Sequence, residues 1–171
     1  MRELTTSRSN RWEAQLLGFP LVNSAYRPPP LSKSETMIKR VLWVTAAVFL
    51  SWLLIGFIIH VPLLSGSYAA TRQLWRPRGE MKMWLTYLNM LLGALVFVFV
   101  YSQFITGKSV RRAMQYGLLF GLAVAFPMSM GTFAAMPIPL PITLVWLGGT
   151  VVEHLVAGLL VGFFIPPTTE E

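Results

Sequence analysis

The chain has 171 residues, of which 54% are apolar and only 12% charged, and its formal net charge is +7. Soluble domains carry about 25% charged residues, so this composition excludes an ordinary soluble protein and indicates an integral membrane protein. The absence of cysteine excludes disulfides and thiolate metal sites. The positive charge predicts no nucleic-acid partner, because basic residues beside membrane spans bind anionic lipid headgroups.

Residues 1–37 predict a cytoplasmic arm and a juxtamembrane segment. The stretch RWEAQLLGFPLVNSAYRPPPL mixes aromatic residues with a proline triplet and cannot form a core of its own. Ser32 and Glu35 form a capping-box pattern, which predicts that the first helix begins near residue 33. The candidate residues for docking onto a partner subunit are all aromatic: Trp12, Phe19 and Tyr26 in the arm and Trp75 in the first loop.

Four long apolar stretches follow, at 41–64, 84–106, 113–133 and 142–165. Each reaches the roughly 20 residues that a helix needs to cross a hydrocarbon core of about 30 Å. They predict an all-α membrane protein with four transmembrane helices in a bundle and a non-globular N-terminal arm. The transmembrane domain is expected at 38–165 and a C-terminal tail at 166–171.

The distribution of Lys and Arg predicts the orientation. Ten lie in the N-terminal segment and the second loop, against four in the first loop. Because cytoplasmic loops carry the excess of basic residues, both termini are predicted to be cytoplasmic, in a bacterial inner membrane. The first loop should also form a short interfacial helix from Tyr68 to Trp75.

Small residues and a proline mark the last two spans. Glycines four residues apart let helix backbones approach closely, and the candidate packing positions are Gly117, Gly121, Gly158 and Gly162. Pro127 interrupts the third span and should kink it, with Ser129 or Thr132 available to satisfy the freed backbone.

Glu153 and His154 stand side by side in the middle of the fourth span, where a charged residue costs roughly 3 kcal/mol on insertion scales. Three interpretations remain open. Both side chains are hydrogen-bonded inside the bundle, or they form a proton or substrate path, or His154 ligates a haem or chlorophyll in the room that the glycines beneath it leave. The candidate bonding partners within the bundle are Asn89, Tyr87, Thr143 and Tyr116.

His60 closes the first span beside Pro62 and is a second, weaker candidate for a pigment or haem ligand. The alternative is an interfacial histidine that bonds the first loop. No further His, Cys or carboxylate stands at metal-ligand spacing, so no metal site is predicted. We expect no cofactor of the protein's own, other than a bound lipid or a tetrapyrrole contact.

Several motifs point to one group of proteins: GFIIHVPLLSGSY, WRPRGEM, YGLLFGLAVAFP, MPIPLP and WLGGTVVEHLVAGLLVGFF. Through them, residues 52–165 resemble small bacterial four-helix membrane proteins of uncharacterised function. The resemblance implies the fold and topology, and it equates His60 and Glu153 with a histidine that closes the first span and an acid inside the last. The N-terminal arm departs from that pattern and indicates adaptation to a larger partner.

The sequence therefore supports two main hypotheses, neither of them an enzyme. One is an accessory structural subunit that stabilises a larger membrane supercomplex. Its partners would be membrane lipids and other membrane subunits, most specifically the reaction-centre and antenna polypeptides of a photosynthetic complex. The alternative is a small transporter or proton-coupled carrier that uses Glu153. A membrane enzyme acting on lipid or quinone ranks below both, because only two histidines and one buried acid are present.

Overall fold

The computed structural model describes residues 33–165. Within that range the regular structure is helical without strands, and four helices are long and apolar enough to cross a membrane. The prediction of an all-helical, multi-pass membrane protein is confirmed to that extent. The predictions for the arm and the tail, including those for Trp12, Phe19, Tyr26 and Ser32, concern residues outside this range.

The four long helices coincide with the four predicted spans. They are α2 (Lys33–Ile58), α4 (Met83–Phe104), α5 (Val110–Ala135) and α6 (Leu140–Phe164). Helix α2 begins where the capping pattern predicts and continues into a π-helical turn, η1 (Ile59–Leu63), which contains Pro62. This wider turn carries His60 at the end of the first span.

The first loop contains short helices rather than the single interfacial helix that was predicted. Helix α3 (Ser65–Ala70) and the 3-10 turn η2 (Arg72–Leu74) are separated at Thr71, whose backbone leaves the helical region at φ −114° and ψ 27°. The Thr71 hydroxyl donates back to the Ser67 carbonyl at 2.8 Å. A further 3-10 turn, η3 (Arg78–Glu80), precedes α4.

Local signals also set the start of α5. Gly107 has a positive φ of 57°, a conformation that glycine adopts without steric cost. Ser109 is the N-cap, and its side chain accepts a hydrogen bond from the Arg112 backbone N–H at 3.2 Å. The Arg112 guanidinium bonds the carbonyls of Thr106 and Gly107. This short connection returns the chain directly from α4 into α5.

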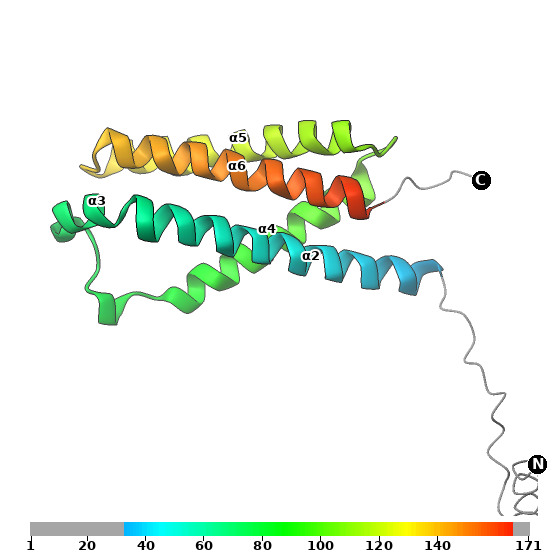
Figure 1. The fold of residues 1–171 in the computed structure, drawn as a ribbon, viewed down its shortest axis with the longest axis horizontal. Coiled ribbons are helices and arrows are strands. Elements are labelled where there is room, and N and C mark those ends of the chain that lie inside the picture. Colours follow the sequence, from blue (N-terminus) through cyan, green and yellow to red (C-terminus); the bar gives the residue numbers. More distant parts are fainter. Residues whose placement is uncertain (1–32, 166–171) are drawn as a thin grey trace, which may run out of the picture. The chain divides into compact units, whose positions relative to one another are not determined.

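The helices are packed unequally. Helices α5 and α6 lie against each other along most of their length, and α2 packs on both α4 and α6. All the residues that α4 buries lie in its second half, from Ala94 to Ser102. In Figure 1 the first half of α4 runs obliquely away from α5 and α6. The first half of α4 and the other three long helices line a cavity.

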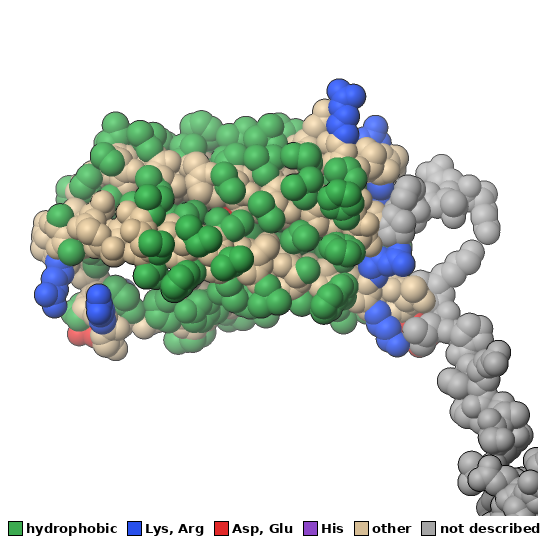
Figure 2. All heavy atoms as spheres, viewed as in Figure 1, with side chains coloured by type: hydrophobic (Ala, Val, Ile, Leu, Met, Phe, Trp, Pro, Cys, Tyr) green, Lys and Arg blue, Asp and Glu red, His purple; other side chains and the backbone are tan. Residues whose placement is uncertain are grey.

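The main core lies where all four long helices meet. Its fully buried side chains include Val44, Val48, Phe97, Tyr101, Ala157 and Val161. Outside this core, apolar side chains cover the face shown in Figure 2 between basic residues at its two ends. That distribution is the one expected for helices that contact lipid.

Pro127 lies inside α5, which continues to Ala135. The prediction that Ser129 or Thr132 bonds the carbonyl freed by this proline was wrong. Thr132 donates to the Met128 carbonyl instead. The buried Ser129 hydroxyl has no partner among the described residues. It belongs to the buried stripe of small residues on α5, which also contains Ala113, Gly117, Gly121 and Ala125.

Candidate functional site

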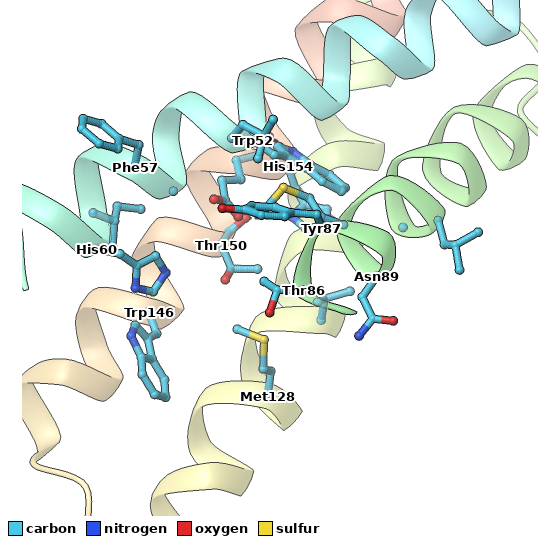
Figure 3. A pocket seen from close by; sticks show the side chains of 18 of the residues that line it. Trp52, Phe57, His60, Thr86, Tyr87, Asn89, Met128, Trp146, Thr150 and His154 are labelled. Carbon is cyan, nitrogen blue, oxygen red and sulfur yellow. Dashed lines mark hydrogen bonds between the residues drawn. The ribbon is translucent and has the colours of Figure 1, made fainter. Parts of the chain in front are cut away.

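A cavity of about 920 Å³ occupies the space that the oblique course of α4 creates. All four long helices line it, and most of the lining is apolar. Its polar lining residues include His60, Thr86, Asn89, Thr150 and Glu153. Figure 3 shows several of these side chains around the open space between the helices. An apolar cavity with a few polar groups is typical of a small-molecule binding site.

Glu153 extends from α6 toward α2. A Cβ built on Gly56 would lie 3.6 Å from Glu153 Oε1, so the carboxyl group lies beside a position of α2 that has no side chain. Among the described residues, no hydrogen bond or ion pair engages this carboxyl group, although the Glu153 carbonyl accepts a hydrogen bond from Trp52 Nε1 at 2.8 Å. Glu153 is thus the acid of the cavity, with its oxygens free for a ligand.

His154 faces a different environment from its neighbour. Its side chain is 5% exposed, and Nδ1 donates to the Thr150 carbonyl at 2.8 Å. The rings of Trp52, Phe97 and Phe120 surround it, with centroid distances of 4.8, 5.7 and 5.7 Å. His154 therefore anchors α6 within an aromatic cluster, although it also lines the cavity that Glu153 faces.

The predicted side-chain partners of the Glu153 and His154 pair were wrong. Tyr116 donates to the Phe97 carbonyl at 2.8 Å, and Thr143 donates to the Pro139 carbonyl at 3.5 Å. Tyr87 and Asn89 line the cavity without bonding either residue of the pair. His154 bonds a backbone carbonyl because the preceding turn of its own helix is the nearest acceptor.

The four glycines singled out in the sequence lie between α5 and α6. A Cβ on Gly117 would stand 2.4 Å from the His154 carbonyl oxygen, and one on Gly158 would stand 2.7 Å from that of Ala113. Corresponding distances for Gly121 and Gly162 are 2.8 and 2.9 Å, to the β-carbons of His154 and Ala113. Only glycine permits this approach of the two backbones. The space beside these glycines is filled by the close approach of α5 and α6, whereas His154 also lines the cavity, and its predicted role as a pigment or haem ligand stays a prediction.

A second group of polar and aromatic residues, termed here the loop cluster, joins the first loop to η1 and α6. Trp146 Nε1 donates to the Tyr68 hydroxyl at 2.8 Å, and the same hydroxyl lies 2.6 Å from His60 Nδ1. Because an indole N–H only donates, Tyr68 accepts from Trp146 and its own proton is available to His60. His60 therefore bonds the first loop, as the alternative interpretation of this residue expected.

Trp75 completes the loop cluster. Its ring packs edge-on against Tyr68 and Trp146, with centroid distances of 5.2 and 6.0 Å. Its indole N–H donates to the Thr71 hydroxyl at 2.9 Å. The Trp75 ring is half-buried by these contacts within the protein, and its role as a docking residue stays a prediction.

Comparisons of the chain with protein-family models, with curated proteins and with solved structures found no match. No group of three or more His, Cys, Asp or Glu side chains converges within residues 33–165.

Sequence reasoning identified Glu153, His154 and His60 but missed the residues that define their surroundings. Trp52 contacts His154 and bonds the Glu153 carbonyl, yet in sequence it is one of several tryptophans in apolar spans. Gly56 is an isolated glycine that lacks the four-residue spacing of the packing motif. No pattern in the sequence indicated that Gly56 lies beside Glu153.

The loop cluster should lose stability when the Tyr68 hydroxyl is removed. Tyr68→Phe would leave the Trp146 indole N–H without an acceptor, at a cost of about 1–3 kcal/mol. We expect faster subtilisin cleavage between α2 and α4 in this variant than in the parent protein. Tyr87→Phe is the control, because the Tyr87 hydroxyl has no bond to the loop; equal acceleration by both variants would contradict the role of Tyr68.

The same cluster should respond to alkaline pH. Burial raises the pKa of Tyr68 above its ordinary value of 10.0, and the hydrogen bond from Trp146 lowers it in part. A raised folded-state pKa contributes stability that is present below about pH 10 and is lost as pH rises through the folded-state pKa. When the pH is raised above about 10, the rate of subtilisin cleavage, normalised to an unstructured substrate, should therefore increase more for the parent protein than for Tyr68→Phe.

Proposed function

We propose that this protein is a non-catalytic accessory subunit of a larger bacterial membrane complex. The observation that carries the proposal is that only the second half of α4 is buried against the other helices. From Met83 to Gly93 this helix buries no residue, and among the described elements it packs extensively only on α2. A membrane helix that lacks neighbours of its own chain on one side is well suited to contact another subunit.

The docking surface is the outer face of α4. Its members recur at helical spacing and point away from the cavity: Trp84, Leu88, Leu91 and Leu95. Trp84 is 65% exposed. Tryptophan is enriched at membrane interfaces and in protein–protein contacts, so an exposed tryptophan on this face suits a docking surface. The aromatic residues of the N-terminal arm are proposed as a second contact with the same partner.

The most specific candidate for the partner is a photosynthetic reaction centre with its light-harvesting polypeptides, and a respiratory complex is the next. Both are large helical assemblies in which a small multi-pass subunit can brace neighbouring helices. The proposed location is the bacterial inner membrane, with both termini in the cytoplasm, since the excess of Lys and Arg lies on that side.

Photo-crosslinking in native membranes tests the docking surface. With p-benzoylphenylalanine in place of Leu88, we expect a discrete crosslinked protein that comigrates with a large complex on a native gel. Mass spectrometry and the absorption spectrum of that band would then identify the complex. The control is the same substitution at Leu54, which is 62% exposed on α2. Crosslinking only to lipid at both positions would contradict the proposal.

A small carrier is the second candidate, and the cavity with its unpaired Glu153 favours it. The cavity reaches the interior of the spans from the surface beside α4, and Glu153 lies near the middle of α6. An ionisable residue at such a depth is a functional candidate, because its cost to membrane insertion must be offset by a role.

The two candidates differ in the effect of Glu153→Gln. If the protein is a carrier, solute or proton flux into proteoliposomes should be lost while the abundance of the protein in native membranes stays unchanged. If it is only an accessory subunit, neither quantity should change. Gln103→Ala is the control, because Gln103 is exposed and does not line the cavity; loss of flux in both variants would indicate general damage.

A further inference from the structure

The cavity contains an acid without a Lys or Arg counterpart. Among the residues that line it, Glu153 is the acidic member and none is Lys or Arg. The two histidines of the lining bond other groups, His60 the Tyr68 hydroxyl and His154 the Thr150 carbonyl. Within residues 33–165 the carboxyl group has no hydrogen-bond or ion-pair partner. An unpaired carboxylate is costly in a low-dielectric environment, whereas pairing with a cation offsets part of that cost. The site therefore has the charge that favours a positively charged ligand.

Aromatic rings line the same cavity as this acid. Trp52 is held in position by its hydrogen bond to the Glu153 carbonyl, and Tyr87 and Phe57 line the cavity from α4 and α2. Figure 3 labels Trp52, Phe57 and Tyr87 among the side chains that line the cavity. The faces of aromatic rings attract cations, most strongly when water is excluded. Carboxyl group and rings thus favour the same class of ligand.

The surface of the cavity also constrains the rest of the ligand. Much of the lining is apolar, with Leu53, Met90, Val96 and Val124 among its members. Its volume of about 920 Å³ lies within the range of roughly 300–1,000 Å³ that is typical of small-molecule sites. A small inorganic cation would leave this apolar surface unfilled. A bulky apolar body that carries the charge would cover it.

The entrance lies within the membrane-spanning region. Tyr87 is 47% exposed and Val96 is 51% exposed, although both line the cavity. Both belong to α4, the helix that stands apart from α5 and α6. A ligand that is already dissolved in the bilayer would reach Glu153 beside this helix without crossing an aqueous path.

From these four features we infer that the cavity binds a lipophilic cation, with its charge near Glu153 and its apolar body against the aromatic and aliphatic lining. The inference rests on the cavity of the second candidate function. It concerns binding, however, and holds whether or not the bound molecule is transported.

Two probes of equal size and opposite charge test this inference. Equilibrium dialysis of the full chain in nanodiscs, corrected with empty nanodiscs, should show saturable binding of tetraphenylphosphonium and none of tetraphenylborate. Binding of the cation should weaken about tenfold or more in Glu153→Gln, since close charge pairs contribute strongly at buried sites. Glu153→Asp should retain most of the affinity, because it preserves the charge.

Equal binding of the two ions, no saturable binding of either, or unchanged affinity in Glu153→Gln would overturn the inference. Tyr87→Leu provides a second variant if Glu153→Gln fails to fold, because Tyr87 is half-exposed and holds no core contact. It should weaken cation binding several-fold, and unchanged affinity would count against the aromatic contribution. Loss of flux with retained binding of tetraphenylphosphonium would contradict the carrier function but not the binding inference. Retained flux without binding of tetraphenylphosphonium would contradict the binding inference but not the carrier function.

Discussion

Replacing Gly117 with alanine is expected to destabilise the contact between α5 and α6 by about 1–3 kcal/mol, the usual range for overpacking. The added methyl group would stand 2.4 Å from the His154 carbonyl oxygen, so one of the two backbones must move. The measurement is the midpoint of SDS-induced unfolding in mixed micelles, followed by circular dichroism. The same change at Gly158, which would approach the Ala113 carbonyl oxygen at 2.7 Å, should act in the same direction.

Gly131 offers a matched control in the same helix. A Cβ at this position meets nothing within 4 Å. Gly131→Ala should therefore leave the midpoint unchanged or raise it slightly, because alanine is the better helix former. Equal effects at Gly117 and Gly131 would show that helix propensity, and not the close approach of α5 and α6, determines the result.

Trp52→Ala is expected to be the most damaging substitution in α2, with a loss of about 3–5 kcal/mol that is typical for a buried tryptophan. Trp52 packs on Phe97 and His154 with centroid distances of 6.2 and 4.8 Å. It also bonds the Glu153 carbonyl. Its removal would thus loosen α2 from both α4 and α6. The same unfolding assay measures the change.

Trp43 is the control, because it belongs to the same helix and is 66% exposed. Trp43→Ala should shift the unfolding midpoint little, since its ring does not contact the core. Trp52→Phe should fall between the two, because it keeps an aromatic ring and loses the indole N–H. A similar loss for Trp43→Ala and Trp52→Ala would contradict the assigned role of Trp52.

Glu153 and His154 show how much of the candidate site could be predicted from the sequence. Glu153 and His154 were recognisable because polar groups are rare in an apolar span. Their separation into different environments was not, because it depends on which neighbouring helix lies at each angle around α6. Trp52 and Gly56 of α2 make that difference, and both are more than 90 residues away in the chain.

The loop cluster shows the same limit at smaller scale. The sequence indicated interfacial aromatic residues in the first loop and a histidine at the end of the first span. The hydrogen bonds from Trp146 to Tyr68 and between Tyr68 and His60 bring together three segments, one of which lies in the last helix. Because an aromatic residue at a membrane interface has many suitable partners, the local sequence pattern does not show which partner it contacts.

The sequence alone therefore established the class of protein, the four apolar helices and the close-packing glycines. These properties follow from local physics: the length of an apolar run must match the bilayer, and glycine spacing places small residues on one helix face. The oblique course of α4, the cavity beside it and the exposure of Glu153 to that cavity were decided only by the tertiary structure. These features depend on how unevenly the helices pack. The sequence does not reveal them, because an apolar residue that faces lipid and one that faces a cavity look alike in sequence.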